Sequence, residues 1–138
     1  MIIFERLVIL GVGLMGGSLA LAAKQAGAVK TVVGWSRTDA TLQAALASGV
    51  IDEAQSDLSL ALAAADCVVV ATPTILAESV MQQALEQVPA TTAVTDVASV
   101  KGNIAKSLTQ AFGSIPTNAI LGHPIAGSER SGVAAAQA

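Results

Sequence analysis

Short apolar runs alternate along this chain with longer stretches in which apolar residues recur every three or four positions. Continuous apolar runs are typical of strands buried on both faces of a parallel sheet, whereas the longer spacing is typical of a helix with one apolar face. The strand candidates are Leu7–Leu10, Thr31–Trp35, Val50–Ala54, Cys67–Ala71, Thr92–Thr95 and Ala119–Leu121. The helix candidates are Leu14–Ala26, Asp39–Ser48, Leu58–Ala65, Ile75–Val88 and a later segment with Val100, Ile104, Leu108 and Phe112 on one face.

This alternation predicts an α/β fold with a Rossmann-type, doubly wound and mainly parallel sheet. No linker or repeat interrupts it, so we expect residues 1–138 to form a single domain. Hydrophobic residues make up 53% of the chain and aromatic residues only 2%, so the core must consist of Ala, Val, Leu and Ile. The first helix is expected to pack on the sheet through the face that carries Met15, Leu19, Ala22 and Ala26.

The first strand candidate leads directly into glycines with the spacing G-x-G-x-x-G, at Gly11, Gly13 and Gly16. In a dinucleotide-binding turn the first glycine makes the tight turn, the second lets a pyrophosphate approach the backbone and the third lets the helix pack close to its strand. Free amides at the start of the helix, next to Leu14 and Met15, would then face the phosphates. The sequence therefore predicts a dinucleotide-binding domain over residues 1–138.

The same stretch has a membrane interpretation, because no charge falls between Arg6 and Lys24 and because Gly13 and Gly17 match the G-x-x-x-G packing motif. Against it, Glu5 lies where a signal peptide carries only positive charge. The glycines would also weaken an isolated spanning helix. We therefore expect a cytoplasmic protein that makes no contact with a membrane.

The second strand candidate ends at Trp35, and the residues that follow it bear on the choice of cofactor. An NAD site normally places an acidic residue here, on the ribose 2′-hydroxyl. This chain has Ser36 and Arg37 instead, and their hydroxyl and guanidinium suit a 2′-phosphate. The pattern favours NADP over NAD. In the alternative interpretation Arg37 is a solvated loop charge and Ser36 or Thr38 caps the next helix.

The strand candidate Cys67–Ala71 ends at Thr72 and Pro73. In doubly wound sheets ligands lie outside the carboxyl ends of the strands, so these two residues could contact the ribose or nicotinamide of the cofactor. Equally, Pro73 could simply end the strand and Thr74 could cap the helix Ile75–Val88. Both interpretations stay open.

Two residues near the carboxyl ends of the last strand candidates could carry out chemistry. His123 is the only histidine, and its ordinary pKa suits proton transfer near neutral pH. Ser99 follows the preceding strand, so the two side chains could converge if these strands are neighbours, although Ser99 could also be an N-cap and His123 a packed loop residue. Other polar residues on the same loops are more typical of surface or capping positions: Asp96, Lys101, Glu129 and Arg130.

Charge and cysteine content exclude several classes of function. The net charge is −3 and the chain has no tyrosine, so nucleic-acid binding lacks both its electrostatic and its stacking contribution. Cys67 is the only cysteine, which excludes a disulfide within the chain, and its apolar neighbours predict a buried thiol. One cysteine and one histidine also argue against a zinc site, and we expect no metal.

Three motifs together resemble the prephenate/arogenate (cyclohexadienyl) dehydrogenase family. They are Gly-Leu-Met-Gly-Gly-Ser-Leu-Ala at 13–20, Asp96 with Ser99-Val100-Lys101, and Gly-His-Pro-Ile-Ala-Gly-Ser-Glu at 122–129. The resemblance implies oxidative decarboxylation of prephenate or arogenate in tyrosine biosynthesis. His123 would take the proton of the ring hydroxyl, Ser99 would orient it, and Glu129 would lie near the substrate.

The resemblance also has two departures. Many relatives carry an acidic residue where this chain has Ser36, which again favours NADP. Family members continue into a helical domain that completes the substrate site and forms a homodimer, so this chain resembles their cofactor domain, and a fragment of this kind could be inactive alone. The competing functions are a related β-hydroxy-acid or imino reductase and a non-catalytic NADP-binding module.

Overall fold

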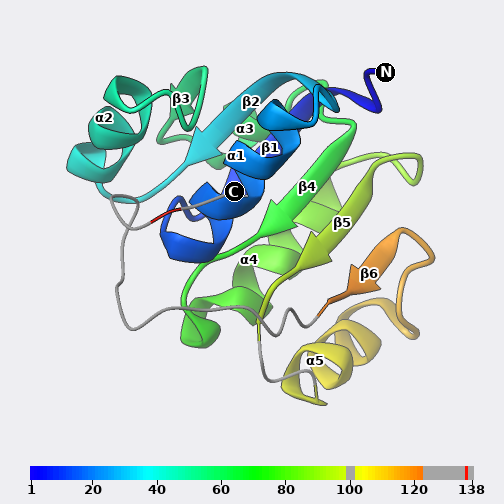
Figure 1. Cartoon of the computed structure of the whole chain (residues 1–138). Helices are drawn as coiled ribbons and strands as arrows, with labels where there is room; N and C mark the ends of the chain where they lie inside the picture. Colours follow the sequence, from blue (N-terminus) through cyan, green and yellow to red (C-terminus); the bar gives the residue numbers. More distant parts are fainter. Residues whose placement is uncertain (99–101, 123–135, 137–138) are drawn as a thin grey trace.

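The computed structural model of the chain describes residues 1–98, 102–122 and 136. Within these residues six strands form one sheet: β1 (Phe4–Leu10), β2 (Val29–Trp35), β3 (Glu53–Gln55), β4 (Cys67–Val70), β5 (Ala93–Asp96) and β6 (Ala119–Leu121). The strands lie in the order β3-β2-β1-β4-β5-β6, and every neighbouring pair is parallel (Figure 1). This is the strand order of a Rossmann sheet. The predicted fold class is confirmed, with parallel pairing throughout.

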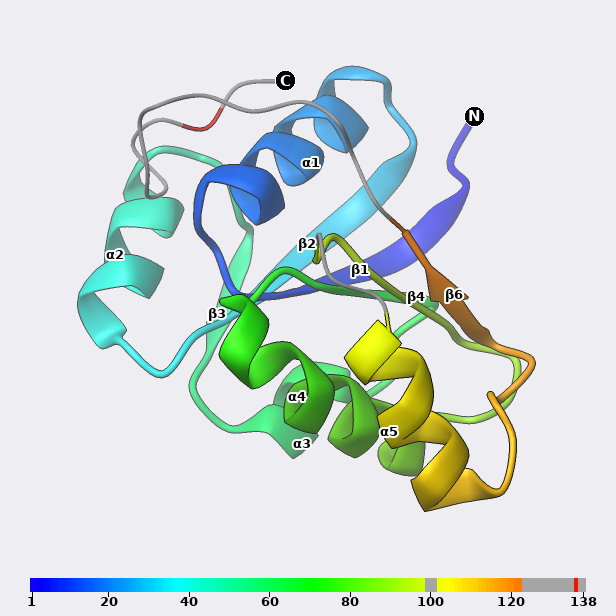
Figure 2. The same ribbon diagram turned by 90° about the horizontal axis from the view of Figure 1, so that it is seen from below.

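Helices cover both faces of the sheet. They are α1 (Leu14–Gln25), α2 (Asp39–Ala47), α3 (Leu58–Leu62), α4 (Thr74–Gln87) and α5 (Gly102–Phe112). Figure 2 shows α1 and α2 on one face and α3, α4 and α5 on the other. Alternate residues of β1 serve the two layers, because Leu7 and Ile9 join the core under α1 and α2 whereas Val8 and Leu10 join the core under α3, α4 and α5.

Helix α1 approaches the sheet through its smallest residues. The buried ones are Gly16, Gly17 and Ala20. The predicted packing face of this helix is therefore wrong, since Leu19 keeps 38% of its surface exposed and Ala26 is exposed as well. A Cβ atom at Gly16 would collide with the carbonyl oxygen of Gly11 and lie 2.8 Å from the Ile9 side chain. Close contact between helix and strand, rather than bulky apolar spacing, sets the orientation of this helix.

Strand β3 begins at Glu53, three residues later than the apolar pattern predicts. Val50 and Ile51 are 3% and 2% exposed and fill the core next to the strand instead of pairing within it. Asp52 then makes the connection to β2, since its N–H donates to the Val32 carbonyl and its carboxylate accepts from the Val32 N–H, both at 2.8 Å. Val50 and Ile51 are therefore buried core residues that precede the strand.

The uncharged stretch between Arg6 and Lys24 divides between β1 and α1. No helix in the described part of the chain is long and apolar enough to cross a membrane. Cys67 is buried as predicted, and burial, with a smaller effect of the Asp66 charge, raises the pKa of its thiol. At the far end of the apolar face of α5, Phe112 is 37% exposed, whereas Ile104 and Leu108 are fully buried.

Candidate functional site

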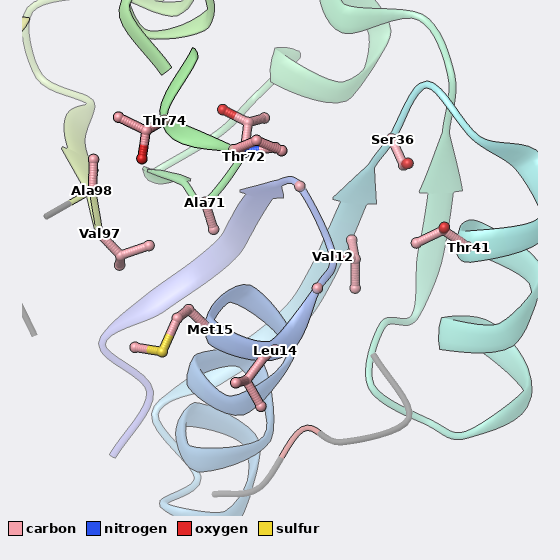
Figure 3. A pocket seen from close by; sticks show the side chains of 13 residues that line it. Val12, Leu14, Met15, Ser36, Thr41, Ala71, Thr72, Thr74, Val97 and Ala98 are labelled. Atoms are coloured by element: carbon pink, nitrogen blue, oxygen red, sulfur yellow. The ribbon is translucent and has the colours of Figure 1, made fainter. Parts of the chain in front are cut away.

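A cavity of about 500 Å³ opens at the carboxyl ends of β1, β2, β4 and β5 (Figure 3). Its lining residues are Gly11, Val12, Gly13, Leu14, Met15, Ser36, Thr41, Ala71, Thr72, Pro73, Thr74, Val97 and Ala98. None of these described residues carries a charged side chain. The cavity lies where the strand order reverses between β1 and β4, which is the position where doubly wound sheets bind ligands.

The turn between β1 and α1 forms the floor of this cavity. Gly11 has a φ of +100°, and a Cβ atom there would lie 2.7 Å from the Thr72 nitrogen, so only glycine fits this turn. Gly13 differs, because a Cβ atom there would meet nothing within 4 Å. Gly13 is also the N-cap of α1 and has no side chain to satisfy the first amides of the helix. The turn therefore has no room for a side chain at Gly11, whereas the space beside Gly13 is open.

Thr72 contributes a buried hydroxyl to the cavity wall. Its Oγ1 atom is inaccessible and has no hydrogen-bond partner within the described residues. Pro73 is the N-cap of α4, and Thr74 is the first residue of that helix. The interpretation of Thr74 as the cap is therefore wrong. Thr72 and Pro73 both line the cavity, as the cofactor interpretation requires.

The residues after β2 form the opposite end of the cavity, where Figure 3 shows Ser36 near Thr41. Ser36 Oγ accepts a hydrogen bond from the Thr38 N–H at 3.1 Å. Thr38 is the N-cap of α2, although its side chain makes no capping bond within the described residues. Sequence reasoning missed Thr41; its position one turn into the helix that follows the strand was the available signal. Arg37 is exposed beside this end and does not line the cavity.

Asp96 is the site residue that sequence reasoning judged least well. It was expected at a surface or capping position. In the structure it is the last residue of β5 and is only 1% exposed. Its Oδ2 accepts from the Ala98 N–H at 3.0 Å and its Oδ1 accepts from the Gly122 N–H at 3.1 Å. Its place at the carboxyl end of the predicted strand Thr92–Thr95, in the same motif as Ser99, was the available signal.

The structure thus brings most of the predicted cofactor residues to one cavity: Gly11, Gly13, Leu14, Met15, Ser36, Thr72 and Pro73. Gly16 lies behind them, in the contact between α1 and β1. The predicted catalytic residues Ser99 and His123 and the predicted substrate residue Glu129 lie outside the described residues. The strands that precede Ser99 and His123 are neighbours, since β5 pairs with β6.

An all-parallel sheet in this order, with a glycine turn and an uncapped helix start facing a cavity at the strand-order reversal, defines a Rossmann-type nucleotide-binding domain. The family model "Prephenate dehydrogenase, nucleotide-binding domain" matches residues 19–138. The chain belongs to this family of prephenate dehydrogenase nucleotide-binding domains.

Individual relatives agree with this membership. The chain is 34% identical over 137 residues to the prephenate dehydrogenase of Bacillus subtilis strain 168, and the match covers 96% of this chain and 36% of that protein. The structure of the Aquifex aeolicus prephenate dehydrogenase in complex with hydroxyphenyl propionate and NAD+ superposes with a TM-score of 0.86 at 28% identity, covering 96% of this chain and 46% of the other. Synechocystis arogenate dehydrogenase gives a TM-score of 0.83 at 33% identity, covering 96% and 45%.

Proposed function

We propose that this chain is the cofactor-binding part of an NADP-dependent dehydrogenase that oxidatively decarboxylates prephenate or arogenate in tyrosine biosynthesis. Family membership supports the reaction class, and relatives named as prephenate and arogenate dehydrogenases support the two substrates. The observation that carries the proposal is the cavity at the strand-order reversal, with the open Gly13 turn on one side and the unpartnered Thr72 hydroxyl on the other.

The start of α1 suits the phosphates of a dinucleotide. The first amides of a helix have no partner within it, and the helix dipole places partial positive charge there. No acidic residue occupies the first turn of α1 to compete for these amides. At Gly13, the space that a Cβ atom would fill is open to an approaching phosphate.

The Thr72 hydroxyl suits a second polar group of the same ligand. Burying a hydroxyl without a hydrogen-bond partner costs about 1–3 kcal/mol. Thr72 lines the cavity but its hydroxyl is inaccessible, so a ribose hydroxyl or phosphate oxygen of the bound nucleotide would supply the missing partner once the side chain turns toward the cavity. A polar group kept at this expense is more typical of a binding site than of a packed core.

The end of the cavity next to β2 supports the choice of NADP. Ser36 and Thr41 line it with hydroxyl groups, and the described lining includes no carboxylate that would repel a 2′-phosphate. The side chain of Arg37 makes no hydrogen bond or ion pair among the described residues. Its guanidinium is therefore available for a charge-assisted bond to the 2′-phosphate.

The proposed chemistry assigns roles to three residues that follow β5 and β6 in the sequence. His123 takes the proton of the substrate ring hydroxyl, Ser99 orients that hydroxyl and the imidazole, and Glu129 binds near the substrate. A bound nicotinamide would supply the hydride acceptor for the carbon that carries the hydroxyl. Loss of carbon dioxide from the ring then restores aromaticity. Positioning of this kind contributes several kcal/mol to lowering a barrier.

The test uses the full-length protein with prephenate and arogenate as substrates. We expect the His123→Asn variant to lose turnover by about 10²–10⁴-fold, the usual contribution of general base catalysis, while the Kd for NADP stays within about twofold because the proposed role of the imidazole is with the substrate hydroxyl and not with the nucleotide. A fully active His123→Asn variant would contradict the role of His123. Tight NADP binding without oxidation of either substrate would instead support a non-catalytic NADP-binding module.

The proposal also covers location and assembly. A biosynthetic dehydrogenase with small soluble substrates belongs in the cytoplasm, and we propose that location here. For the full-length protein we propose a homodimer, as the resemblance to the family implies, with no nucleic-acid or membrane partner. Sedimentation of the full-length protein at several concentrations checks the dimer, and a concentration-independent monomer would contradict it.

A further inference from the structure

Asp96 occupies an unusual position at the end of the sheet. It is the last residue of β5 and pairs with Leu121 of β6, so it lies where both strands leave the sheet on the cavity side. Asp96 is only 1% exposed. A buried carboxylate is costly unless hydrogen bonds satisfy it. The hydrogen bonds that the Asp96 carboxylate accepts are therefore needed to stabilise an acidic residue at this position.

These bonds join the two segments that leave the sheet. The N–H of Ala98 donates to Oδ2 at 3.0 Å, and the N–H of Gly122 donates to Oδ1 at 3.1 Å. In the sequence, Ala98 directly precedes Ser99 and Gly122 directly precedes His123. One carboxylate thus holds the backbone immediately before each of the two proposed catalytic residues.

Two further contacts fix the same backbone. A Cβ atom at Gly122 would lie 2.7 Å from the Asp96 carbonyl oxygen, so the chain leaving β6 runs directly against Asp96. On the other segment, the N–H of Val97 donates to the Val70 carbonyl at 3.1 Å, and Val97 and Ala98 line the cavity. The carboxylate therefore connects the cavity wall to the segment that leads into His123.

We propose that Asp96 is a positioning residue that fixes where the segments leading to Ser99 and His123 leave the sheet, by accepting one backbone N–H from each segment. The inference rests on the proposed function, because it assigns catalytic roles to these two residues. A carboxylate is required since it has two acceptor oxygens. Asparagine has the same shape but offers one acceptor and one donor, so it can keep only one of the two bonds.

The experiment compares Asp96→Asn with wild type in the full-length protein. Because small misplacements of catalytic groups can cost about a hundredfold in rate, we expect kcat to fall about tenfold to a hundredfold. The Kd for NADP should stay within about twofold, since Asp96 does not line the nucleotide cavity. A fall in kcat that exceeds any rise in KM distinguishes positioning from a general loss of folded protein.

Asp66 provides a matched control. Its Oδ2 also accepts two backbone bonds, from the N–H of Glu5 at 2.6 Å and from the N–H of Arg6 at 3.4 Å, but it lies at the opposite end of the sheet, directly before β4. Because both of these bonds go to one oxygen, Asp66→Asn can keep them while it removes the same charge as Asp96→Asn, and we expect it to leave kcat within about twofold. If Asp66→Asn and Asp96→Asn reduce kcat equally, or if Asp96→Asn keeps the wild-type kcat, the proposal is overturned.

A second variant guards against an Asp96→Asn protein that does not fold. Gly122→Ala leaves the carboxylate intact but forces the segment before His123 away from Asp96, and we expect a similar loss of kcat; wild-type kcat in this variant would count against the proposal. The failures are separable. A wild-type protein that oxidises neither substrate overturns the proposed function, whereas active wild type with unimpaired Asp96→Asn overturns the positioning role alone.

Discussion

The two ends of the sheet are built from different kinds of interaction. At the amino end, charged side chains pair with one another: Arg6 with Glu53 at 2.7 Å, Lys24 with Asp52 at 2.8 Å and Lys30 with Glu5 at 3.6 Å. The buried Thr92 hydroxyl at this end is also satisfied, since it donates to the Ala65 carbonyl at 2.7 Å. Polar groups here have their partners within the chain.

At the carboxyl end, polar groups are either unpaired or turned toward the backbone. The Thr72 hydroxyl has no partner among the described residues, and the first amides of α1 have no capping side chain. Asp96, a carboxylate at this end, accepts hydrogen bonds from the backbone N–H groups of Ala98 and Gly122. The cavity lining lacks charge throughout its described residues.

The difference indicates that stability and binding are separated along the strands. The ion pairs at the amino end connect β1 to β3, β2 to β1, and α1 to the residue before β3. Among the described residues at the carboxyl end, the first amides of α1 lack a capping side chain and one buried hydroxyl lacks a partner, at some expense in stability. Substitutions at the amino end should therefore change the free energy of unfolding, and matched substitutions at the carboxyl end should change ligand affinity.

The largest expected effect concerns the glycine turn. Gly13→Ala places a Cβ atom where the chain itself has nothing within 4 Å, so we expect little change in stability but at least a tenfold weaker Kd for NADP. Calorimetric titration and thermal unfolding measure both quantities on the same sample. Undiminished NADP affinity in Gly13→Ala would contradict a phosphate position at this turn.

Gly11→Ala is the matched control within the same turn. The backbone φ of +100° and the 2.7 Å approach to the Thr72 nitrogen should make this variant less stable by about 1–3 kcal/mol. A Gly13→Ala variant that loses as much stability as Gly11→Ala would show that the open position also serves the fold.

A smaller effect is expected from a pair of threonines, one at each end of the sheet. Thr72→Val removes a hydroxyl without a partner, so we expect stability to be unchanged or raised and the Kd for NADP to weaken about threefold to tenfold. Thr92→Val removes a satisfied hydroxyl, so we expect a loss of about 1 kcal/mol in the free energy of unfolding and an unchanged Kd. Urea unfolding and titration of both variants give the four values, and a reversed pattern would break the comparison.

The smallest effect concerns acid stability at the amino end. Burial alone would raise the pKa of Asp52, but the bonds from Lys24 and the Val32 N–H, with the Lys24 charge, lower it below its ordinary value of 3.8. A depressed pKa in the folded state means that the charged form stabilises the fold above about pH 4 and that this contribution is lost as the pH falls through the folded-state pKa.

Asp52→Asn should therefore reduce stability at pH 7 by about 0.2–1 kcal/mol, the usual range for exposed pairs, and by less at pH 3. Urea unfolding at the two pH values measures the difference. An equal loss at both pH values would mean that the charge on Asp52 plays no part in stability.

Most of the fold could be predicted from the sequence because apolar runs and helical spacing report burial directly. Helix α2 shows this well: it spans Asp39–Ala47 where the pattern predicts a helix over Asp39–Ser48, and Leu42 and Ala45 are buried. The errors arise where helix packing depends on small residues that let two backbones approach closely. The inner face of α1 consists of Gly16, Gly17 and Ala20, and a scale of hydrophobicity gives little weight to residues whose role is to allow close approach.

The candidate site could be predicted only in part. The glycine spacing located the turn at Gly11 and Gly13, because such a turn has strict backbone requirements. The buried role of Asp96 was not predicted because it depends on β5 and β6 becoming neighbours, since its carboxylate bonds to Ala98 and to the distant Gly122. Thr41 was missed although it follows β2 closely in the sequence. The assignments of Ser99, His123 and Glu129 stay predictions.

The most direct test of the central claim, that the carboxyl end of the sheet binds NADP, is a calorimetric titration of this chain with NADP and NAD at fixed salt. Arg37→Ala and Lys30→Ala are compared, since each removes one exposed positive charge, at the carboxyl and the amino end respectively. We expect NADP to bind at least tenfold more tightly than NAD, with this preference lost in Arg37→Ala and kept in Lys30→Ala. Equal affinity for the two nucleotides, or a folded chain that binds neither, would contradict the account.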